Sequence, residues 1–376
     1  MLFSQFQRTD GSTKRYRETE FEFIDRSADP DVAAVRALLE VEFDRYIEAD
    51  KPEIQARLQS RRDREFKSAC FELLLYGMLS RLGFHLETHP DPGTGKGSRP
   101  DFLVTTPKGE SFFLEAVLAA DVRDSATGTR AMKDELIDAI DRDPHPNFYL
   151  SIVESGVPAS QPSAKRLRKH LHHWLNGLDV DAVAEDLAKN GHEHLPSEHW
   201  EHDGWELRFR VIPKQKSRGK LDRLIGTLSG DAGWVDLKTP IREAIRFKGQ
   251  RYGSLALPLV VAVNVDAFHL NQGDEVDALF GSEALAISQD NVRRIRRTDG
   301  AWHDGREPRS SRVSAAWLFN DLSFWSIAGR RQTLYVNPWA LTPLGNALDC
   351  LPVAKIVDGE ISRTEGPSPG EIFSSH

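Results

Sequence analysis

Cysteine is nearly absent from this chain of 376 residues, which contains only Cys70 and Cys350. Two thiols provide neither a disulfide framework nor a thiolate zinc site. Cys70 lies within an apolar segment of helical periodicity, where core packing is its expected role. Bound chemistry must therefore depend on other side chains.

Long apolar runs are also absent. No segment approaches the roughly 18 consecutive apolar residues that a membrane-spanning helix needs, and residues 1–17 lack the apolar stretch of a secretion signal. We therefore expect no membrane partner and take the cytoplasm as the default compartment. The hydrophobic content of 39% is enough for one elaborated domain or two ordinary ones.

An overall excess of positive charge is missing too, because 49 Lys and Arg face 57 Asp and Glu, which gives a formal net charge of -8. This balance argues against a surface that is basic throughout. Basic residues are nevertheless concentrated between Trp205 and Tyr252, where twelve of them, from Arg208 to Arg251, face five acidic residues. This segment is a candidate for contact with a polyanion.

The first third of the chain has a clear order of expected elements. Apolar residues at helical spacing predict helices from Asp31 to Leu82, and Gly83 ends the last of them. The pattern then becomes β-like on both sides of Pro107-Lys108-Gly109, a hairpin connection. The expected elements are a helix at 62–82, a short strand at 85–88, a Gly- and Pro-rich turn at 90–98, and strands at 100–106 and 111–119.

The rest of the chain alternates in type. The segment 258–264 is the most clearly buried strand, and the helix before it returns the chain to a central sheet. We expect an irregular His-rich linker at 191–203, an exposed basic stretch at 214–220 and disorder over the last twenty residues. The further expected elements are helices at 132–142, 164–178, 181–190 and 241–252, and strands at 148–153 and 205–212.

Two carboxylates, Asp101 and Glu115, interrupt the apolar strands of the predicted hairpin. A hairpin turning near Lys108 places them opposite each other. Two neighbouring carboxylates repel unless one is protonated or a cation neutralises both, and burying them unpaired is costly. The pattern therefore predicts a site for a divalent metal ion. In the structural alternative, the Asp caps a turn and the Glu pairs with an arginine such as Arg99.

The sequence Pro100-Asp101, its spacer and Glu115-Ala116-Val117 resemble the signature of the PD-(D/E)xK nuclease superfamily, over residues 62–118. The resemblance implies an α/β fold with a restriction-endonuclease-like core of helix, mixed β-sheet and helix. It also implies a metal-activated water that attacks a phosphodiester, with Mg²⁺ or Mn²⁺ as the cofactor. In that family the first helix often carries a glutamate that faces the site, and Glu72 fits this position.

The chain departs from the family where a lysine is expected, because Val117 stands two residues after Glu115. In some members of the superfamily the lysine comes from another element. Lys248, on the predicted helix before the buried strand, is the best replacement, and Lys133 is a second candidate. Gln250 and Tyr252 lie close to Lys248 in the sequence, and similar polar residues assist some relatives.

On this interpretation, a large α/β insertion divides the core. The expected regions are N-terminal helices at 1–61, the first half of the core at 62–119, a basic and His-rich insertion at 120–239, the second half of the core with an elaboration at 240–345, and a flexible tail at 346–376.

Other patterns carry weaker signals. The segment 93–98 resembles a phosphate-binding loop but lacks its first glycine and the helix that should follow, so we reject that motif. The basic residues of 165–169 either meet phosphates or are solvated. Four histidines in the linker have no clean zinc spacing, and four tryptophans are expected in the core rather than stacked on bases. These are His192, His194, His199 and His202, and Trp302, Trp317, Trp325 and Trp339.

Two hypotheses follow. The first is a Mg²⁺-dependent nuclease that hydrolyses phosphodiester bonds, with DNA as the expected partner and a defence or restriction role by analogy alone. The alternative is a catalytically inactive, nuclease-like protein that binds nucleic acid or a protein partner. The sequence leaves open DNA versus RNA, cleavage specificity, the biological pathway and the oligomeric state, with a dimer among the alternatives.

Overall fold

The structure is a computed structural model that describes residues 1–119, 127–215, 217–221, 223–230, 238–265, 270–288, 291–303, 307–358 and 360–374. They form a mixed α/β fold, as expected, which divides into two compact units. Unit 1 comprises Met1–Ser12, Thr19–Val122 and Asp236–His376, and unit 2 comprises Thr13–Glu18 and Arg123–Val235. The main segment of unit 2 therefore falls inside the region 120–239 that we expected as an insertion.

Helices dominate the N-terminal part of unit 1. Thr19 caps the first helix in a capping box with Glu22, and Asp29 caps the second, which begins at Pro30. The longest helix packs its apolar face onto the sheet of unit 1. The elements are α1 (Glu20–Arg26), α2 (Pro30–Arg45), η1 (Glu48–Asp50), α3 (Lys51–Leu58) and α4 (Asp63–Arg81).

The sheet of unit 1 has eight strands in the order β1-β2-β3-β8-β11-β12-β13-β14. The central strands β3, β8 and β11 are parallel, and β8 is buried along its whole length, as its apolar sequence predicts for a strand covered on both faces. The strands are β1 (His85–Thr88), β2 (Phe102–Thr105), β3 (Ser111–Ala119), β8 (Leu259–Val265), β11 (Ala315–Asn320), β12 (Gln332–Val336), β13 (Val353–Val357) and β14 (Glu360–Thr364).

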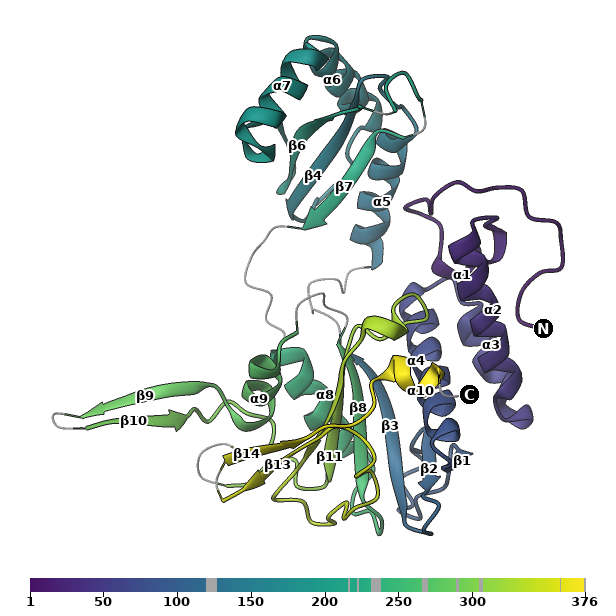
Figure 1. The fold of residues 1–376 in the computed structure, drawn as a ribbon, viewed down its shortest axis with the longest axis vertical. Helices are drawn as coiled ribbons and strands as arrows, with labels where there is room; N and C mark the ends of the chain where they lie inside the picture. Colours follow the sequence, from purple (N-terminus) through teal and green to yellow (C-terminus); the bar gives the residue numbers. More distant parts are fainter. Residues whose placement is uncertain are drawn as a thin grey trace. The chain divides into compact units, whose positions relative to one another are not determined.

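Helices cover both faces of this sheet (Figure 1). On one face Leu114 and Val260 share a core with α4. On the other, Val261 and Val263 pack with α8 (Lys238–Arg251) and α9 (Gln272–Phe280). Because side chains alternate along a strand, Glu115 of β3 points to the α8 face.

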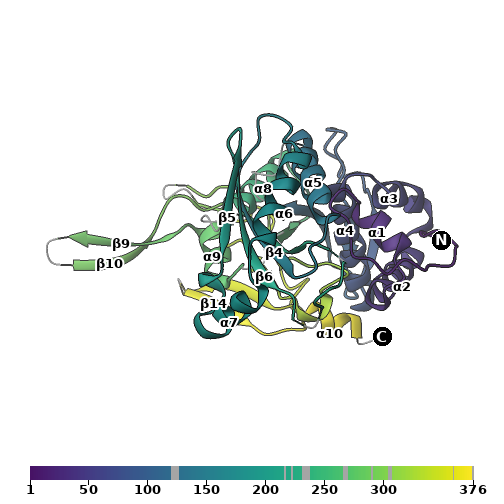
Figure 2. The same ribbon diagram turned by 90° about the horizontal axis from the view of Figure 1, so that it is seen from above.

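A two-stranded ribbon, β9 (Glu283–Ser288) and β10 (Asn291–Arg296), forms a separate sheet. It projects from the end of α9 in both views (Figure 1 and Figure 2). Its base is tied to α8, because Arg242 Nη1 donates to Asp299 O at 2.8 Å and Arg246 Nη2 donates to Gly300 O at 2.9 Å. The ribbon is thereby anchored to the helix that carries Lys248.

Unit 2 has its own sheet, in the order β5-β6-β4-β7, and its own core, in which Leu150, Leu171 and Phe209 are fully buried. The amphipathic patterns at 164–178 and 181–190 correspond to two of its helices. The elements are α5 (Thr127–Asp141), β4 (Phe148–Gly156), α6 (Ala164–Asn176), α7 (Val180–Asn190), η3 (His192–His194), β5 (Ser197–His202), β6 (Trp205–Pro213) and β7 (Ile225–Gly230).

The irregular linker expected at 191–203 is wrong over half its length, because β5 pairs with β6 in an antiparallel ladder. Exposed and partly buried residues alternate along β5, so no residue of this strand is fully buried. An edge strand without a buried face needs no apolar alternation. The polar sequence around His199 and His202 therefore gave no strand signal.

The exposed basic stretch expected at 214–220 is wrong at its first residue. Lys214 is only 2% exposed. Its Nζ donates to Lys220 O at 2.8 Å and lies 4.2 Å from the centre of the Tyr149 ring. The ammonium closes the turn after β6, a contact that depends on tertiary structure.

The flexible tail expected at 346–376 is also wrong for the residues that the structure describes. Strands β13 and β14 extend the sheet, and α10 (Pro369–Ser374) contacts α4 and η4 (Ile327–Gly329). Ile372 is 3% exposed, and Arg81 lies over the Phe373 ring. The apolar residues of β13 lie close together, but the sequence after them is polar and rich in Pro and Gly, and it therefore resembled a tail.

The four tryptophans that we expected in the core differ in burial. Trp302 and Trp317 are fully buried and Trp339 is partly buried, as expected, whereas Trp325 is 42% exposed. Within the part of the chain that the structure describes, no helix is both long and apolar enough to cross a membrane.

Replacing Ile372 with alanine should lower the free energy of unfolding by about 2 to 4 kcal/mol, because a buried side chain leaves a cavity against α4. Val357→Ala, at a residue that is 45% exposed, is the control and should change stability little. Urea unfolding followed by tryptophan fluorescence checks both variants. Equal midpoints for Ile372→Ala and the wild type would show that α10 adds nothing to the core.

Candidate active site

The structure brings Asp101 and Glu115 together at the start of the β2–β3 hairpin. The register pairs Phe102 with Leu114, so one further step places Asp101 opposite Glu115. The backbone N–H of Ala116 donates to Asp101 Oδ2 at 2.6 Å, which holds this carboxylate against β3. The hairpin therefore places the two carboxylates as its turn at Lys108 predicts.

Asp101 forms no ion pair with any residue that the structure describes, in contrast to Glu72 and Glu115. Burial raises its pKa well above the ordinary value, and repulsion by Glu115 and then Glu72 raises it further. The Ala116 N–H and the Lys248 ammonium act in the opposite direction without cancelling the increase. Among the described residues, none donates a hydrogen bond to the second oxygen of Asp101.

Glu115 is held by α8 and the residue that follows this helix. Its side chain is 1% exposed. The Lys248 ammonium donates to Oε1 and the Tyr252 hydroxyl donates to Oε2. Arg251 Nη1 lies 3.5 Å from Oε1. The neutralising arginine is therefore not Arg99, whose Nη1 donates to the carbonyl of His89.

Lys248 thus supplies an ammonium that Val117 cannot supply. Val117 points to the α8 face, as alternation predicts, and packs against the apolar core there. The side chain of Lys248 is 13% exposed. The second candidate, Lys133, lies in unit 2, where its Nζ is 3.2 Å from Glu154 Oε2 and donates to Gly156 O.

Gln250 is not brought to the carboxylates. Each residue advances about 100° around an α-helix, so Gln250 lies about 200° from Lys248, whereas Tyr252 returns to the face of Lys248. Gln250 is accordingly exposed. Proximity in sequence grouped it with Lys248, but helical geometry separates them.

Glu72 approaches the site from α4 and is already neutralised. It is 2% exposed, and Tyr46 OH donates to Oε1 at 3.0 Å while Arg57 Nη1 donates to Oε2 at 2.6 Å. Burial lowers the pKa of Arg57, but Glu72 and then Asp101 raise it by more. Sequence reasoning missed Arg57 and Tyr46. The only signal was that a buried glutamate requires a partner.

These contacts decide what the site can hold. Of three buried or nearly buried carboxylates, Glu72 pairs with Arg57 and Glu115 with Lys248, which leaves Asp101. Within the described ranges, no group of three or more His, Cys, Asp or Glu side chains has metal-binding spacing. Mg²⁺ does not require such a group, because it keeps several waters and binds through one or two carboxylates. Asp101 and Glu115 supply two such carboxylates, of which Glu115 already accepts hydrogen bonds on both oxygens.

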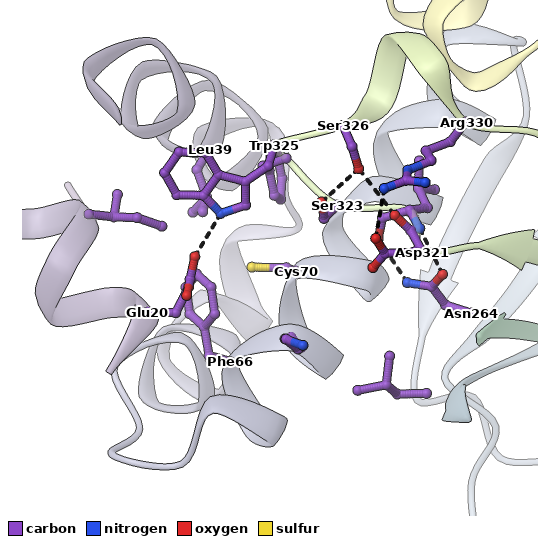
Figure 3. A pocket seen from close by; sticks show the side chains of 15 residues that line it. Glu20, Leu39, Phe66, Cys70, Asn264, Asp321, Ser323, Trp325, Ser326 and Arg330 are labelled. Atoms are coloured by element: carbon purple, nitrogen blue, oxygen red, sulfur yellow. Dashed lines mark hydrogen bonds and ion pairs between the residues drawn. The ribbon is translucent and has the colours of Figure 1, made fainter. Parts of the chain in front are cut away.

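A separate cavity of about 360 Å³ lies near the carboxyl ends of β3 and β8, where Leu118 and Asn264 line it. Figure 3 shows Cys70 of α4 between Glu20 and Trp325 on one side of the cavity and Asp321 and Arg330 on the other. Two pairs of its polar groups contact each other: Arg330 Nη2 lies 2.7 Å from Asp321 Oδ2, and Trp325 Nε1 donates to Glu20 Oε1 at 2.7 Å. None of the predicted site residues lines this cavity.

The basic segment from Arg208 to Arg251 is divided between the two units, because β6 belongs to unit 2 and α8 to unit 1. The basic residues of this segment therefore do not all belong to one unit. The part of the segment that contacts Glu115 is the end of α8, with Lys248 and Arg251.

Comparison of the chain with protein-family models, with curated proteins and with solved structures finds no match.

Replacing Asp101 with asparagine should stabilise the protein in EDTA at pH 8. The pKa of Asp101 is raised on folding, so the unfolded state loses its proton first, and stability falls as pH rises from about 4 through the folded pKa. Asparagine removes this cost, which is about 1.4 kcal/mol per unit of pKa increase.

Thermal unfolding at pH 4 to 8 measures the effect, with Asp44→Asn, at an exposed position on α2, as the control. The gain from Asp101→Asn should shrink as pH falls toward 4, where the unfolded carboxyl, with an ordinary pKa of about 3.9, is about half protonated. A gain that is independent of pH would contradict this electrostatic account of Asp101.

Proposed function

We propose that this chain is a Mg²⁺- or Mn²⁺-dependent nuclease with a restriction-endonuclease-like core. The observation that carries the proposal is the Lys248 ammonium on the carboxylate of Glu115, opposite Asp101. The signature of the superfamily combines an acidic pair with a lysine, and here the lysine comes from α8 instead of position 117.

The order of elements supports the same interpretation. The helix α4 precedes the β1–β2–β3 meander, and after unit 2 the chain continues with α8 and with β8, which is parallel to β3. This order of helix, hairpin, helix and strand is the one that the resemblance implies. Unit 2 occupies the place of the insertion.

Each residue has a defined role in the proposed reaction. Asp101 and Glu115 would hold the divalent ion, which when bound would activate water and offset charge on the phosphate. Lys248 and Tyr252 orient the carboxylate of Glu115, and Lys248 also contributes positive charge beside the scissile phosphate. Hydrogen bonds from Arg57 and Tyr46 fix Glu72, whose negative charge acts on Asp101. DNA is the proposed substrate, and a role in defence or restriction rests on analogy alone.

Purified protein incubated with plasmid and linear DNA should cleave in Mg²⁺ or Mn²⁺ and stop in EDTA. Asp101→Asn, Glu115→Gln and Lys248→Ala should each lower the rate by about 100-fold or more, the scale for losing one group that stabilises developing charge. Lys355→Ala removes an exposed lysine from β13 and should retain activity. Parallel RNA substrates test the choice of nucleic acid.

An inactive, nucleic-acid-binding protein is the second candidate, favoured by the occupation of both Glu115 oxygens by Lys248 and Tyr252. It predicts salt-sensitive DNA binding without turnover, unaffected by Asp101→Ala. Metal-dependent cleavage that Lys248→Ala abolishes would exclude it. Wild-type protein that binds DNA but never cleaves it would exclude the enzyme.

A further inference from the structure

The loop between β1 and β2 begins and ends at the candidate site. His89 N donates to Asp101 O at 3.0 Å, and Arg99 Nη1 donates to His89 O at 3.3 Å. These bonds close the base of residues 90–100, a segment that contains the glycines of 93–97. The base of the loop is therefore attached directly to Asp101.

The backbone of 93–97 has a conformation that suits an anion. Gly93, Gly95 and Gly97 have φ of +70°, +68° and +67°, whereas Thr94 and Lys96 between them do not have positive φ. A backbone in which the sign of φ alternates in this way can turn successive N–H groups toward one side and form a concave nest for anions. Gly93 N donates to Asp91 Oδ1, but the N–H groups of residues 94–97 donate to no described residue.

The side chains of the loop give an independent indication. The hydroxyl of Thr94 is buried and has no hydrogen-bond partner among the residues that the structure describes. Lys96 is exposed, and no described carboxylate forms an ion pair with it. The Thr94 hydroxyl, the Lys96 ammonium and the N–H groups of residues 94–97 are hydrogen-bond donors for which the described residues provide no acceptor. Phosphate oxygens supply the acceptors that such a set lacks.

The loop is contiguous with the end of α8. A Cβ built on Gly253 would lie 3.3 Å from Lys96 Cε and 3.6 Å from Lys96 Nζ. The Tyr252 hydroxyl, which donates to Glu115, also donates to Arg99 O at 3.3 Å. Lys96 thus lies beside Gly253, which directly follows the residue that orients Glu115.

We propose that residues 93–97, with the Lys96 ammonium, bind a phosphate group of the nucleic acid next to the one that is cleaved. The inference rests on the proposed function for the kind of substrate. The phosphate is either part of the continuous backbone or the monophosphate at a strand end, since both present the same oxygens. A helix after the loop is not needed, because the nest itself provides the donors.

Two matched pairs of variants test the proposal in the full-length protein. Lys96→Ala is compared with Lys108→Ala, which removes an exposed lysine from the turn at the other end of β2. Gly95→Ala is compared with Gly109→Ala, because both glycines have positive φ and open space around the position of a Cβ. Each pair matches charge or backbone strain, and only the first member changes the nest.

Binding is measured by fluorescence anisotropy in EDTA, which prevents cleavage, with labelled duplex DNA bearing a 5′-phosphate or a 5′-hydroxyl. Lys96→Ala should weaken binding several-fold and lower the slope of log K against log salt by about one, the value for one phosphate contact. Gly95→Ala should also weaken binding. Both controls should bind as the wild type does. A loss confined to the 5′-phosphate duplex identifies a strand end, and an equal loss on both identifies the continuous backbone.

Equal binding by Lys96→Ala and Lys108→Ala, or no measurable binding of either duplex by the wild type, would overturn the proposal. Kinetics in Mg²⁺ separate it from the proposed function. If the wild type cleaves and Lys96→Ala leaves KM unchanged, the phosphate site fails and the nuclease stands. If the wild type never cleaves but the binding differences persist, the nuclease fails and the phosphate site stands.

Discussion

The buried carboxylate of Glu115 is the constraint on which the arrangement of unit 1 depends. It lies on the central strand β3 with 1% exposure, where an uncompensated charge would be costly. Its partners, Lys248 and Tyr252, are 133 and 137 residues further along the chain. The pairing therefore fixes α8 over β3 after the chain has passed through unit 2, and it brings α8, the hairpin and the loop 90–100 to one place.

The three carboxylates near this point, Glu72, Asp101 and Glu115, differ in the hydrogen-bond donors and cations that contact them. Glu72 and Glu115 each receive a cation and a tyrosine hydroxyl, from Arg57 and Tyr46 or from Lys248 and Tyr252. Asp101 receives one backbone N–H, and its pKa is raised. A purely structural cluster would neutralise every member, because each unpaired charge costs stability. The asymmetry is the physical basis for proposing a cation at Asp101, and the donor-rich loop beside it suits an anionic substrate.

Local sequence patterns predicted much of this core. The helical period ending at Gly83, the turn at Pro107-Lys108-Gly109 and the apolar run of β8 each correspond to the element expected from them. These patterns failed to predict elements in which buried residues do not recur at a regular spacing. Strand β5 has no buried face, and α10 is held mainly by Ile372 and its neighbours, so neither leaves a regular apolar signal. Lys214 looked exposed because its partners are carbonyl groups, which no residue pattern reveals.

The sequence by itself determined that Asp101 and Glu115 lie opposite each other, because strand register follows from the position of the turn. It also singled out Lys248 as a replacement for the lysine missing at Val117. Only the tertiary structure decided between Lys248 and Lys133, separated Gln250 from the site and supplied Arg57 to Glu72. Those outcomes depend on which distant elements pack against one another, and packing over more than a hundred residues leaves no periodic trace in the chain.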